Sequence, residues 1–360
     1  MIPRSKSVLS FGELLLRFSI DPAGSWTGGS TLPFSVGGAE ANVATALALW
    51  NIPSAYFTVL PDNLLARQLA AHLEQKNIDT SRIIYFGERM GLFFVPQGGD
   101  MKHAGVIYDR KHSSFDLLKP GDFFWDTIFE GVSWFHISAI SPALNADTAA
   151  VCLEAVQFAS SKGIMVSLDL NYRAQLWKDK ASIEVMIPIA ACCDVIMGNI
   201  WSAEKLLGVK LPPYHQATHG TERSWHLAAA RTCDEGLLAL FPKCKTVALT
   251  FRLQEDAKKN DRSTANIGYY STLNTRDEGL LESDVYEVCG DLNPVGSGDC
   301  FMAGLIYGYY HALPIREVLR FATAAAVKKL FEPGDSTSST VKEIEAMLAS
   351  GKFLLPQSER

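Results

Sequence analysis

Apolar residues recur along the chain with two different periods, and the alternation of these periods predicts an α/β fold. Short apolar runs typical of strands are separated by segments in which apolar residues return every three or four positions. The runs that we interpret as strands are Val8–Gly12, Tyr56–Leu60, Trp134–Ser138, Met165–Asp169, Val195–Gly198 and Thr246–Phe251. The segments that we interpret as helices are Val43–Trp50, Asn63–Gln75, Ala146–Lys162 and one that begins at Pro314 and ends before Pro333. Strands joined by helices predict a mostly parallel sheet with helices on both faces.

Two segments, residues 14–36 and 89–111, break this rhythm. Within the second, Gly91–Pro96 and Gly105–Arg110 have strand character and are typical of a hairpin with a long loop. We expect the two segments to form a small separate β-layer within one domain that spans residues 1–360. Elsewhere Ile267–Thr272 is hairpin-like, and two polar stretches are expected to be exposed loops, at residues 209–228 and 253–266.

The most informative stretch runs from Pro294 to Phe301 and then into a helix. Gly296 and Gly298 permit a tight turn and a close approach to the backbone, and the apolar pattern predicts that a helix begins near Gly298. The first turn of a helix offers unpaired N–H groups that bind anions. Asp299 lies in that turn, so a base stands beside an anion hole, as transfer of a phosphoryl group to a hydroxyl requires. The alternative is that Asp299 only caps a core helix.

A second glycine-containing segment, Val36–Asn42, opens an earlier helix. Gly37 and Gly38 allow a ligand to approach the backbone, and Asn42 offers both a donor and an acceptor. The alternative is a helix start with a buried, hydrogen-bonded Asn.

The remaining polar candidates follow predicted strands: Asp169–Arg173 and Gly198–Asn199. Ligands of open parallel sheets bind beyond the carboxyl ends of the strands, so these residues favour a site at that edge. The chain has no Gly-x-x-x-x-Gly-Lys-Ser/Thr motif and no Gly-x-Gly-x-x-Gly at the first βα turn, which argues against a P-loop enzyme and a dinucleotide-binding enzyme.

Composition narrows the partners. The 33 basic and 39 acidic residues give a net charge of −6, which argues against nucleic acid and against an anionic membrane surface. No apolar run is long enough to span a bilayer. The seven cysteines form no Cys-x-x-Cys pair, so we expect reduced thiols in a cytoplasmic protein rather than disulfides or a zinc site.

Taken together, the two glycine motifs resemble those of the ribokinase-like (PfkB-type) family of carbohydrate kinases. Gly37–Asn42 is similar to the family's sugar-binding motif, and Pro294–Asp299 is similar to its C-terminal signature. The resemblance covers essentially the whole chain and implies a Rossmann-like sheet, ATP and Mg²⁺ as cofactors, and a β lid formed by the two excursions. It also implies that Asp299 is the catalytic base and that the amides of Gly296, Ser297 and Gly298 form the anion hole.

Within the family, four pieces most resemble the 2-keto-3-deoxygluconate kinases: Gly12–Arg17, Met90–Phe93, Tyr108–Arg110 and Asp169–Arg173. The resemblance implies that a sugar acid binds near Phe93. Guanidinium groups hold carboxylates well, so Arg110 and Arg173 are the candidate ligands, with a hydrogen bond from the Tyr108 hydroxyl. The alternative for both arginines is structural ion pairing.

The chain departs from the family pattern mainly on the nucleotide side. Asn293 stands where the signature usually has Asp, which bears on the use of a monovalent cation. Asn199 begins an Asn-x-x-Glu motif whose acid is missing, and the nucleotide loop after Thr250 lacks its glycines, so Arg252 is the candidate phosphate ligand. The rival hypotheses are a kinase for a neutral sugar such as fructose or ribose, and a catalytically weak sugar-binding relative. We also expect a homo-oligomer formed through the lid.

Overall fold

A ten-stranded sheet forms the centre of the protein in the computed structural model, which describes residues 6–19, 32–95, 106–178, 180–213, 222–254, 267–290 and 292–351. The strand order is β15-β14-β13-β12-β11-β10-β1-β4-β6, with β16 paired to β14. The strands are β1 (Ser7–Phe11), β4 (Ser54–Phe57), β6 (Ile78–Asp79), β10 (Val132–Ser138), β11 (Met165–Asp169), β12 (Val195–Gly198), β13 (Thr246–Gln254), β14 (Ile267–Thr275), β15 (Gly279–Glu282) and β16 (Tyr286–Val288). Pairing is parallel from β13 to β6 and antiparallel from β13 to β15. The predicted mostly parallel sheet is therefore confirmed.

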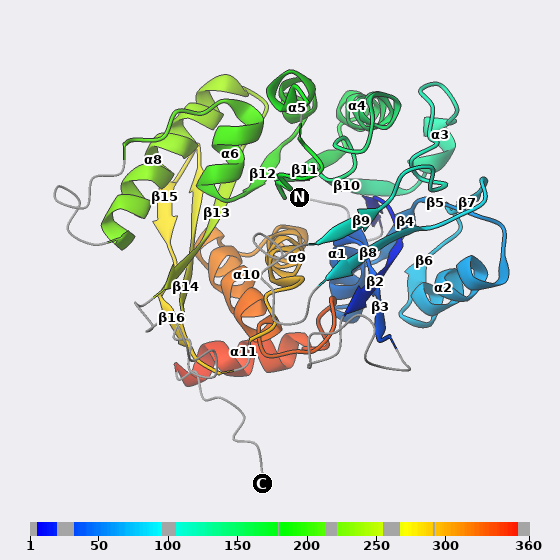
Figure 1. Ribbon diagram of the computed structural model, residues 1–360. Helices are drawn as coiled ribbons and strands as arrows, with labels where there is room; N and C mark the ends of the chain where they lie inside the picture. The colour runs from blue at the N-terminus through cyan, green and yellow to red at the C-terminus, as the bar shows by residue number, and fades with distance from the viewer. Residues whose placement is uncertain are drawn as a thin grey trace, which may run out of the picture.

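Helices cover both faces of this sheet (Figure 1). One face carries α3 (Trp125–Ile128), α4 (Ala146–Ser161), α5 (Ser182–Ala190), α6 (Ile200–Leu207) and α8 (Glu222–Leu240). The other carries α1 (Ala39–Leu49), α9 (Ser297–Tyr310) and α10 (Ile315–Lys329), with α11 (Val341–Ser350) against α10 and α2 (Leu64–Gln75) beside β6. Each layer buries its own apolar cluster against the sheet.

Helices α9 and α10 are packed unusually closely, and this fixes the direction of α9. A Cβ atom at Gly304 would lie 2.5 Å from the Cα atom of Ala322, a distance that no side chain tolerates. Because α9 packs closely against α10, the N-terminus of α9 has a defined position beyond the carboxyl ends of the central strands.

The two excursions pair with each other in one small sheet. Its order is β3-β2-β8-β9, made of β2 (Leu15–Ser19), β3 (Phe34–Gly37), β8 (Gly91–Val95) and β9 (Ile107–Asp109). The β8–β9 pair is antiparallel, as expected for a hairpin, whereas β2 and β8 run parallel. The segments 20–31 and 96–105 lie outside the described residues.

Two local predictions were wrong. The single strand Tyr56–Leu60 is two strands, because β4 pairs with β1 and the next strand, β5 (Val59–Leu60), pairs with β7 (Ile84–Tyr85) in another sheet. A continuous apolar run does not reveal where the pairing partner changes. The expected loop at 209–228 also contains the start of α8, whose first residues, Glu222, Arg223 and Ser224, are polar and show no apolar period. Of the loop expected at 253–266, Leu253 and Gln254 belong to β13, and the rest lies outside the described residues.

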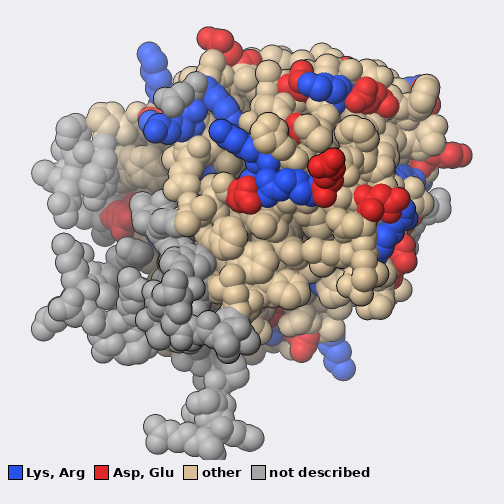
Figure 2. All heavy atoms as spheres, turned by 45° about the vertical axis from the view of Figure 1, so that its right-hand side comes forward, with Lys and Arg blue, Asp and Glu red and all other residues tan. Residues whose placement is uncertain are grey.

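The surface of the described part of the protein mixes charges of both signs. On the face shown in Figure 2, acidic and basic side chains lie beside one another with broad uncharged areas between them. No helix within the described ranges is long and apolar enough to cross a membrane.

Candidate active site

A cavity of about 330 Å³ lies where the carboxyl ends of the central strands, the N-termini of α1 and α9, and the small sheet meet. All of the site residues predicted from the sequence line this cavity except Gly37, which lies immediately before Gly38 in its wall. Sequence segments more than 250 positions apart are therefore brought to one place. The predicted residues in the lining are Gly38, Asn42, Phe93, Tyr108, Arg110, Arg173, Asn199, Thr250, Arg252, Gly296, Ser297, Gly298 and Asp299.

The turn before α9 presents backbone N–H groups to this cavity. Gly296 caps the helix with φ = 78°, and a Cβ atom there would lie 1.8 Å from the carbonyl oxygen of Asp335, so only glycine fits. The Ser297 N–H donates to the Pro294 carbonyl in a long bond of 3.4 Å. Among the described residues, neither the Gly296 N–H nor the Gly298 N–H donates a hydrogen bond. These amides, at the positive end of the α9 dipole, are suited to an anion.

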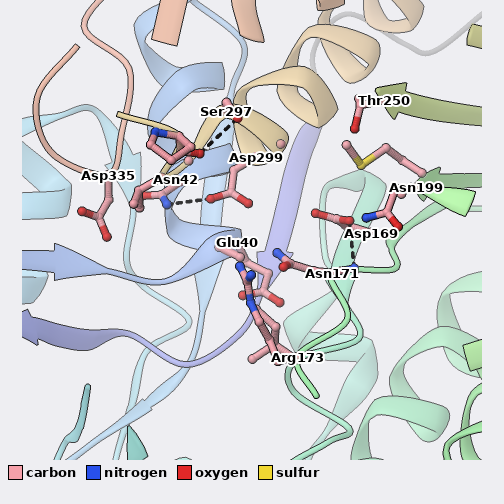
Figure 3. Close-up of a pocket in the computed structure, with 18 of the residues that line it drawn as sticks. Glu40, Asn42, Asp169, Asn171, Arg173, Asn199, Thr250, Ser297, Asp299 and Asp335 are labelled. Atoms are coloured by element: carbon pink, nitrogen blue, oxygen red, sulfur yellow. Dashed lines mark hydrogen bonds between the residues drawn. The ribbon is translucent and has the colours of Figure 1, made fainter. Parts of the chain in front are cut away.

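Asp299 is held in place by Asn42. The Asn42 Nδ2 donates to Asp299 Oδ2 at 2.7 Å (Figure 3). The Asn42 Oδ1 in turn accepts from the Ser336 hydroxyl at 3.1 Å. The Asp299 side chain is nearly buried but faces the cavity. Asn42 therefore fixes the rotamer of a carboxylate that stands beside the α9 amides.

Several acidic groups share this cavity, and their electrostatics are coupled. Burial, together with the nearby charge of Asp169, raises the pKa of Asp299 to about 8. Burial also raises the pKa of Asp169 to about 7, although its Oδ1 accepts from the Asn171 N–H at 3.0 Å. The pKa of Glu40 is raised by burial too, and its Oε1 accepts from the Ser138 N–H at 3.0 Å. A cavity of this kind favours a bound cation or a proton on one of its carboxylates.

The small sheet supplies the apolar wall. The rings of Phe93 and Tyr108 lie 6.1 Å apart and nearly parallel, on the face of the sheet that looks into the cavity. A Cβ atom at Gly37 would lie 3.1 Å from the Phe93 ring, so the glycine makes room for that ring. Gly38 has φ = 142°, where glycine is strongly preferred.

The two candidate arginines differ in their surroundings. Arg110 is buried, and its Nε donates to Glu13 Oε2 at 2.5 Å, while the Ser113 hydroxyl donates to the other oxygen of Glu13. Arg173 follows β11, and no carboxylate of the described residues lies within ion-pair distance of its guanidinium. Its charge lowers the pKa of both Asp169 and Asp299. Arg173 is therefore the cation with more capacity to receive an anionic ligand.

The residues expected on the nucleotide side lie together at the other end of the cavity. Asn199 caps α6, and its Oδ1 accepts from the Ser202 N–H at 2.9 Å. Arg252 donates from Nη2 to the Ser297 hydroxyl at 2.8 Å and so links β13 to the start of α9. Thr250 lines the cavity on the same side as Asn199 (Figure 3).

Sequence reasoning gave no individual role to several acidic residues that line the cavity, among them Glu40, Asp169 and Asp335. Glu40 lies inside the Gly37–Asn42 motif, and Asp169 ends a correctly predicted strand, so both had a local signal. Asp335 had none: it lies in the loop after α10 and pairs with Arg17 of the small sheet at 2.7 Å.

The chain is similar to known sugar kinases over most of its length. The profile of the pfkB family carbohydrate kinases matches residues 5–229 and 292–342. The 2-dehydro-3-deoxygalactonokinase of Haloferax volcanii is 25% identical over 346 residues, which cover 96% of this chain and 97% of that protein.

Solved structures agree with this similarity. The 2-dehydro-3-deoxygluconokinase of Thermotoga maritima superposes with a TM-score of 0.83 at 32% identity and covers 96% of this chain and 100% of that chain. A fructokinase of Xylella fastidiosa, solved with bound ATP, has the same fold, with a TM-score of 0.74 at 20% identity over 97% of this chain and 100% of that chain. With the two glycine motifs meeting in one cavity, these matches show that the chain is a sugar kinase and belongs to the pfkB family of carbohydrate kinases.

Proposed function

We propose that this kinase transfers the γ-phosphate of ATP to a primary hydroxyl of a sugar acid, with 2-keto-3-deoxygluconate as the preferred substrate. The observation that carries the proposal is the position of Arg173. Its guanidinium lines the same cavity as Asp299, and no carboxylate of the described residues lies within ion-pair distance of it. If the carboxylate of a sugar acid bound to Arg173, the hydroxyl at the other end of the sugar would lie toward Asp299. The names of the similar enzymes from Haloferax and Thermotoga also denote kinases of sugar acids.

The proposed chemistry assigns one role to each wall of the cavity. Asp299 accepts the proton of the attacking hydroxyl, whose oxygen bonds to the γ-phosphorus while the bond to the β-phosphate oxygen breaks. The amides of Gly296, Ser297 and Gly298 stabilise the charge on the transferred group, with Ser297 giving up its weak bond to Pro294. Tyr108 and Arg110 complete the sugar side, with Arg110 held in orientation by Glu13.

ATP and Mg²⁺ fit the opposite end. The Arg252 guanidinium is anchored on Ser297 beside the anion hole, where a phosphate group would contact it, and Asn199 and Thr250 lie next to it. Mg²⁺ binds through one or two carboxylates together with phosphates and water. Asp169 is a carboxylate that lines the cavity beside Asn199 (Figure 3), and because burial raises its pKa, a bound cation would stabilise its ionised form. The bound metal would neutralise charge on the phosphates.

We propose that the small sheet closes over the sugar as a lid. Arg17 and Asp335 already connect the sheet to the loop beside the anion hole, so closure and completion of the site are physically linked.

The opposite side of the sheet carries a row of apolar residues on four paired strands, with Phe34 59% and Ile107 54% exposed. A second copy of the chain is the proposed partner of this row. Replacing Phe34 and Ile107 by Asp should shift the sedimentation coefficient to that of a monomer.

A cytoplasmic location is proposed as well. All seven cysteines are free thiols, and most of them are buried, which suits a reducing compartment.

A turnover screen tests the substrate. Release of ADP should be measured by chromatography with 2-keto-3-deoxygluconate, 2-keto-3-deoxygalactonate, fructose and ribose, each with ATP and Mg²⁺. The gluconate-derived acid should show the highest kcat/KM. Higher kcat/KM for fructose or ribose would replace the sugar-acid assignment with a neutral-sugar kinase. Sugar binding by calorimetry without any turnover would instead indicate a catalytically weak relative.

A further inference from the structure

A fully buried lysine lies behind the anion hole. Lys329 is in the last turn of α10, where a cation is favoured by the helix dipole, and its side chain has no exposed surface. Its Nζ donates to the carbonyl oxygens of Glu332 at 3.2 Å and Gly334 at 3.1 Å. No carboxylate of the described residues is within ion-pair distance of this ammonium group. The charge is therefore held by main-chain oxygens.

Asn293 donates to the same two oxygens. Its Nδ2 lies 3.0 Å from the Glu332 carbonyl and 2.7 Å from the Gly334 carbonyl. Each carbonyl oxygen has two lone pairs, and here Asn293 takes one and Lys329 the other. Both oxygens are thus fully used by N–H donors.

This cluster is part of the wall of the anion hole. Asn293 precedes the glycine turn, and its Oδ1 accepts from the Val295 N–H at 3.2 Å. A Cβ atom at Gly296 would lie 1.8 Å from the Asp335 carbonyl oxygen and 3.4 Å from Lys329 Cε, so turn and loop are in direct contact. Loosening the 332–335 loop would therefore move the amides that are proposed to bind the transferred phosphate.

We propose that Lys329 is a positioning residue, a built-in cation that together with Asn293 holds the anion hole in shape, and that the enzyme consequently needs no monovalent metal ion. An alkali cation at this place would need oxygen ligands with free lone pairs. With Asp at position 293, a carboxylate and two carbonyls would face one another, an arrangement that a metal cation would stabilise. With Asn293 and Lys329, N–H groups occupy those positions, so the residues present do not fit such an ion.

The carboxylates around Lys329 favour its charged ammonium form, and that charge in turn acts on them. Burial lowers the pKa of Lys329, whereas Glu332, Asp335 and Asp299 raise it. Burial raises the pKa of Asp335, and the charges of Arg17 and then Lys329 oppose this rise, which favours the ionised form that pairs with Arg17. Loss of the charge would weaken the link to the small sheet as well as the loop.

The first test uses the unmodified enzyme and rests on its kinase activity. The kcat is measured by chromatographic release of ADP in K⁺, Na⁺ and tetramethylammonium chloride at an ionic strength of about 0.1 M. We expect kcat to agree within about twofold, because no metal ion contributes to the hole. Activation by K⁺ of about fivefold or more would overturn the inference. Absence of turnover with every sugar would instead contradict the proposed function.

The second test removes the charge. Lys329→Met should lower kcat by about 10-fold to 100-fold, with a smaller effect on the KM of the sugar, because the amides act mainly in the transition state. Lys328→Met on the same turn is the matched control and should leave kcat unchanged. Added K⁺ or NH₄⁺ should restore part of the lost kcat, and more in the double variant Asn293→Asp with Lys329→Met. Circular dichroism verifies the fold. A folded Lys329→Met enzyme with wild-type kcat, or one that no cation rescues, would overturn the proposal, and the cation series above decides it if this variant does not fold.

Discussion

The Asn42 side chain donates a 2.7 Å hydrogen bond to the Asp299 carboxylate across 257 positions of sequence. The bond joins the N-termini of α1 and α9, which each carry a glycine motif. Because Asn42 is itself fixed by Ser336, the Asp299 carboxylate cannot rotate freely away from the α9 amides. The two glycine motifs thus form one unit.

Asp299→Asn should remove the proton acceptor and keep the shape of the site. The amide oxygen of Asn can still accept from Asn42, so the melting temperature should change little. Turnover should fall by about 10²–10⁴, the usual contribution of a general base. Steady-state kinetics measures the fall, and turnover close to that of the wild type would contradict the role of Asp299.

The pH profile should report the Asp169–Asp299 pair. With a pKa of about 8, Asp299 is protonated at neutral pH in the free enzyme, so kcat/KM should rise with pH through this value. Asp169→Asn removes a negative charge that raises the pKa of Asp299, so the acidic limb of the profile should move to lower pH. The exposed Asp126→Asn serves as a control with an unchanged limb. If the limb stays in place in Asp169→Asn, the coupling is absent.

Arg173→Met should weaken the binding of sugar acids more than the binding of neutral sugars. A charge-assisted hydrogen bond contributes about 1.5–3 kcal/mol, so the KM for a sugar acid should rise about tenfold or more and that for a neutral sugar much less. An equal rise in KM for both substrates would argue against a carboxylate ligand.

Arg110→Met is the contrasting case: it leaves Glu13 buried without its cation and should lower the free energy of unfolding by about 3–5 kcal/mol. Urea unfolding measures the stability of both variants, and it should show a large loss for Arg110→Met and a small one for Arg173→Met.

Arg252→Met should affect the nucleotide rather than the sugar. The side chain reaches Ser297 at the start of α9, so its loss should raise the KM for ATP by about tenfold while the KM for the sugar changes little. The exposed Arg231→Met on α8 is the charge-matched control. A rise confined to the sugar KM would place Arg252 on the other side of the reaction.

Saturating sugar should slow hydrogen exchange in the lid strands β2, β3, β8 and β9. Closure over the substrate excludes water and adds contacts to these strands. Strand β11 in the centre of the large sheet provides the internal control. An unchanged rate of hydrogen exchange in the four strands on addition of sugar would argue against a lid.

The local elements could be read from the sequence because their causes are local. Strands β11 and β12 have the predicted bounds, and the helix after the glycine turn begins one residue before Gly298. Periods of apolar residues and the freedom of glycine act within a few positions, so they are visible in the chain itself. The two motifs, in this order, resemble those of the PfkB-type carbohydrate kinases, and that resemblance was sufficient to indicate a sugar kinase.

What only the tertiary structure decided are the partners of side chains across long distances. Nothing near Arg110 in sequence predicts that Glu13 takes its Nε, and nothing near Lys329 predicts that Asn293 shares its two carbonyl oxygens. Asp335 likewise becomes part of the site only because the loop after α10 lies against the Gly296 turn. Such contacts depend on how whole helices and strands pack, and the energy of a buried charge depends on every group around it. A sequence pattern therefore names the chemistry available, and packing decides which groups meet.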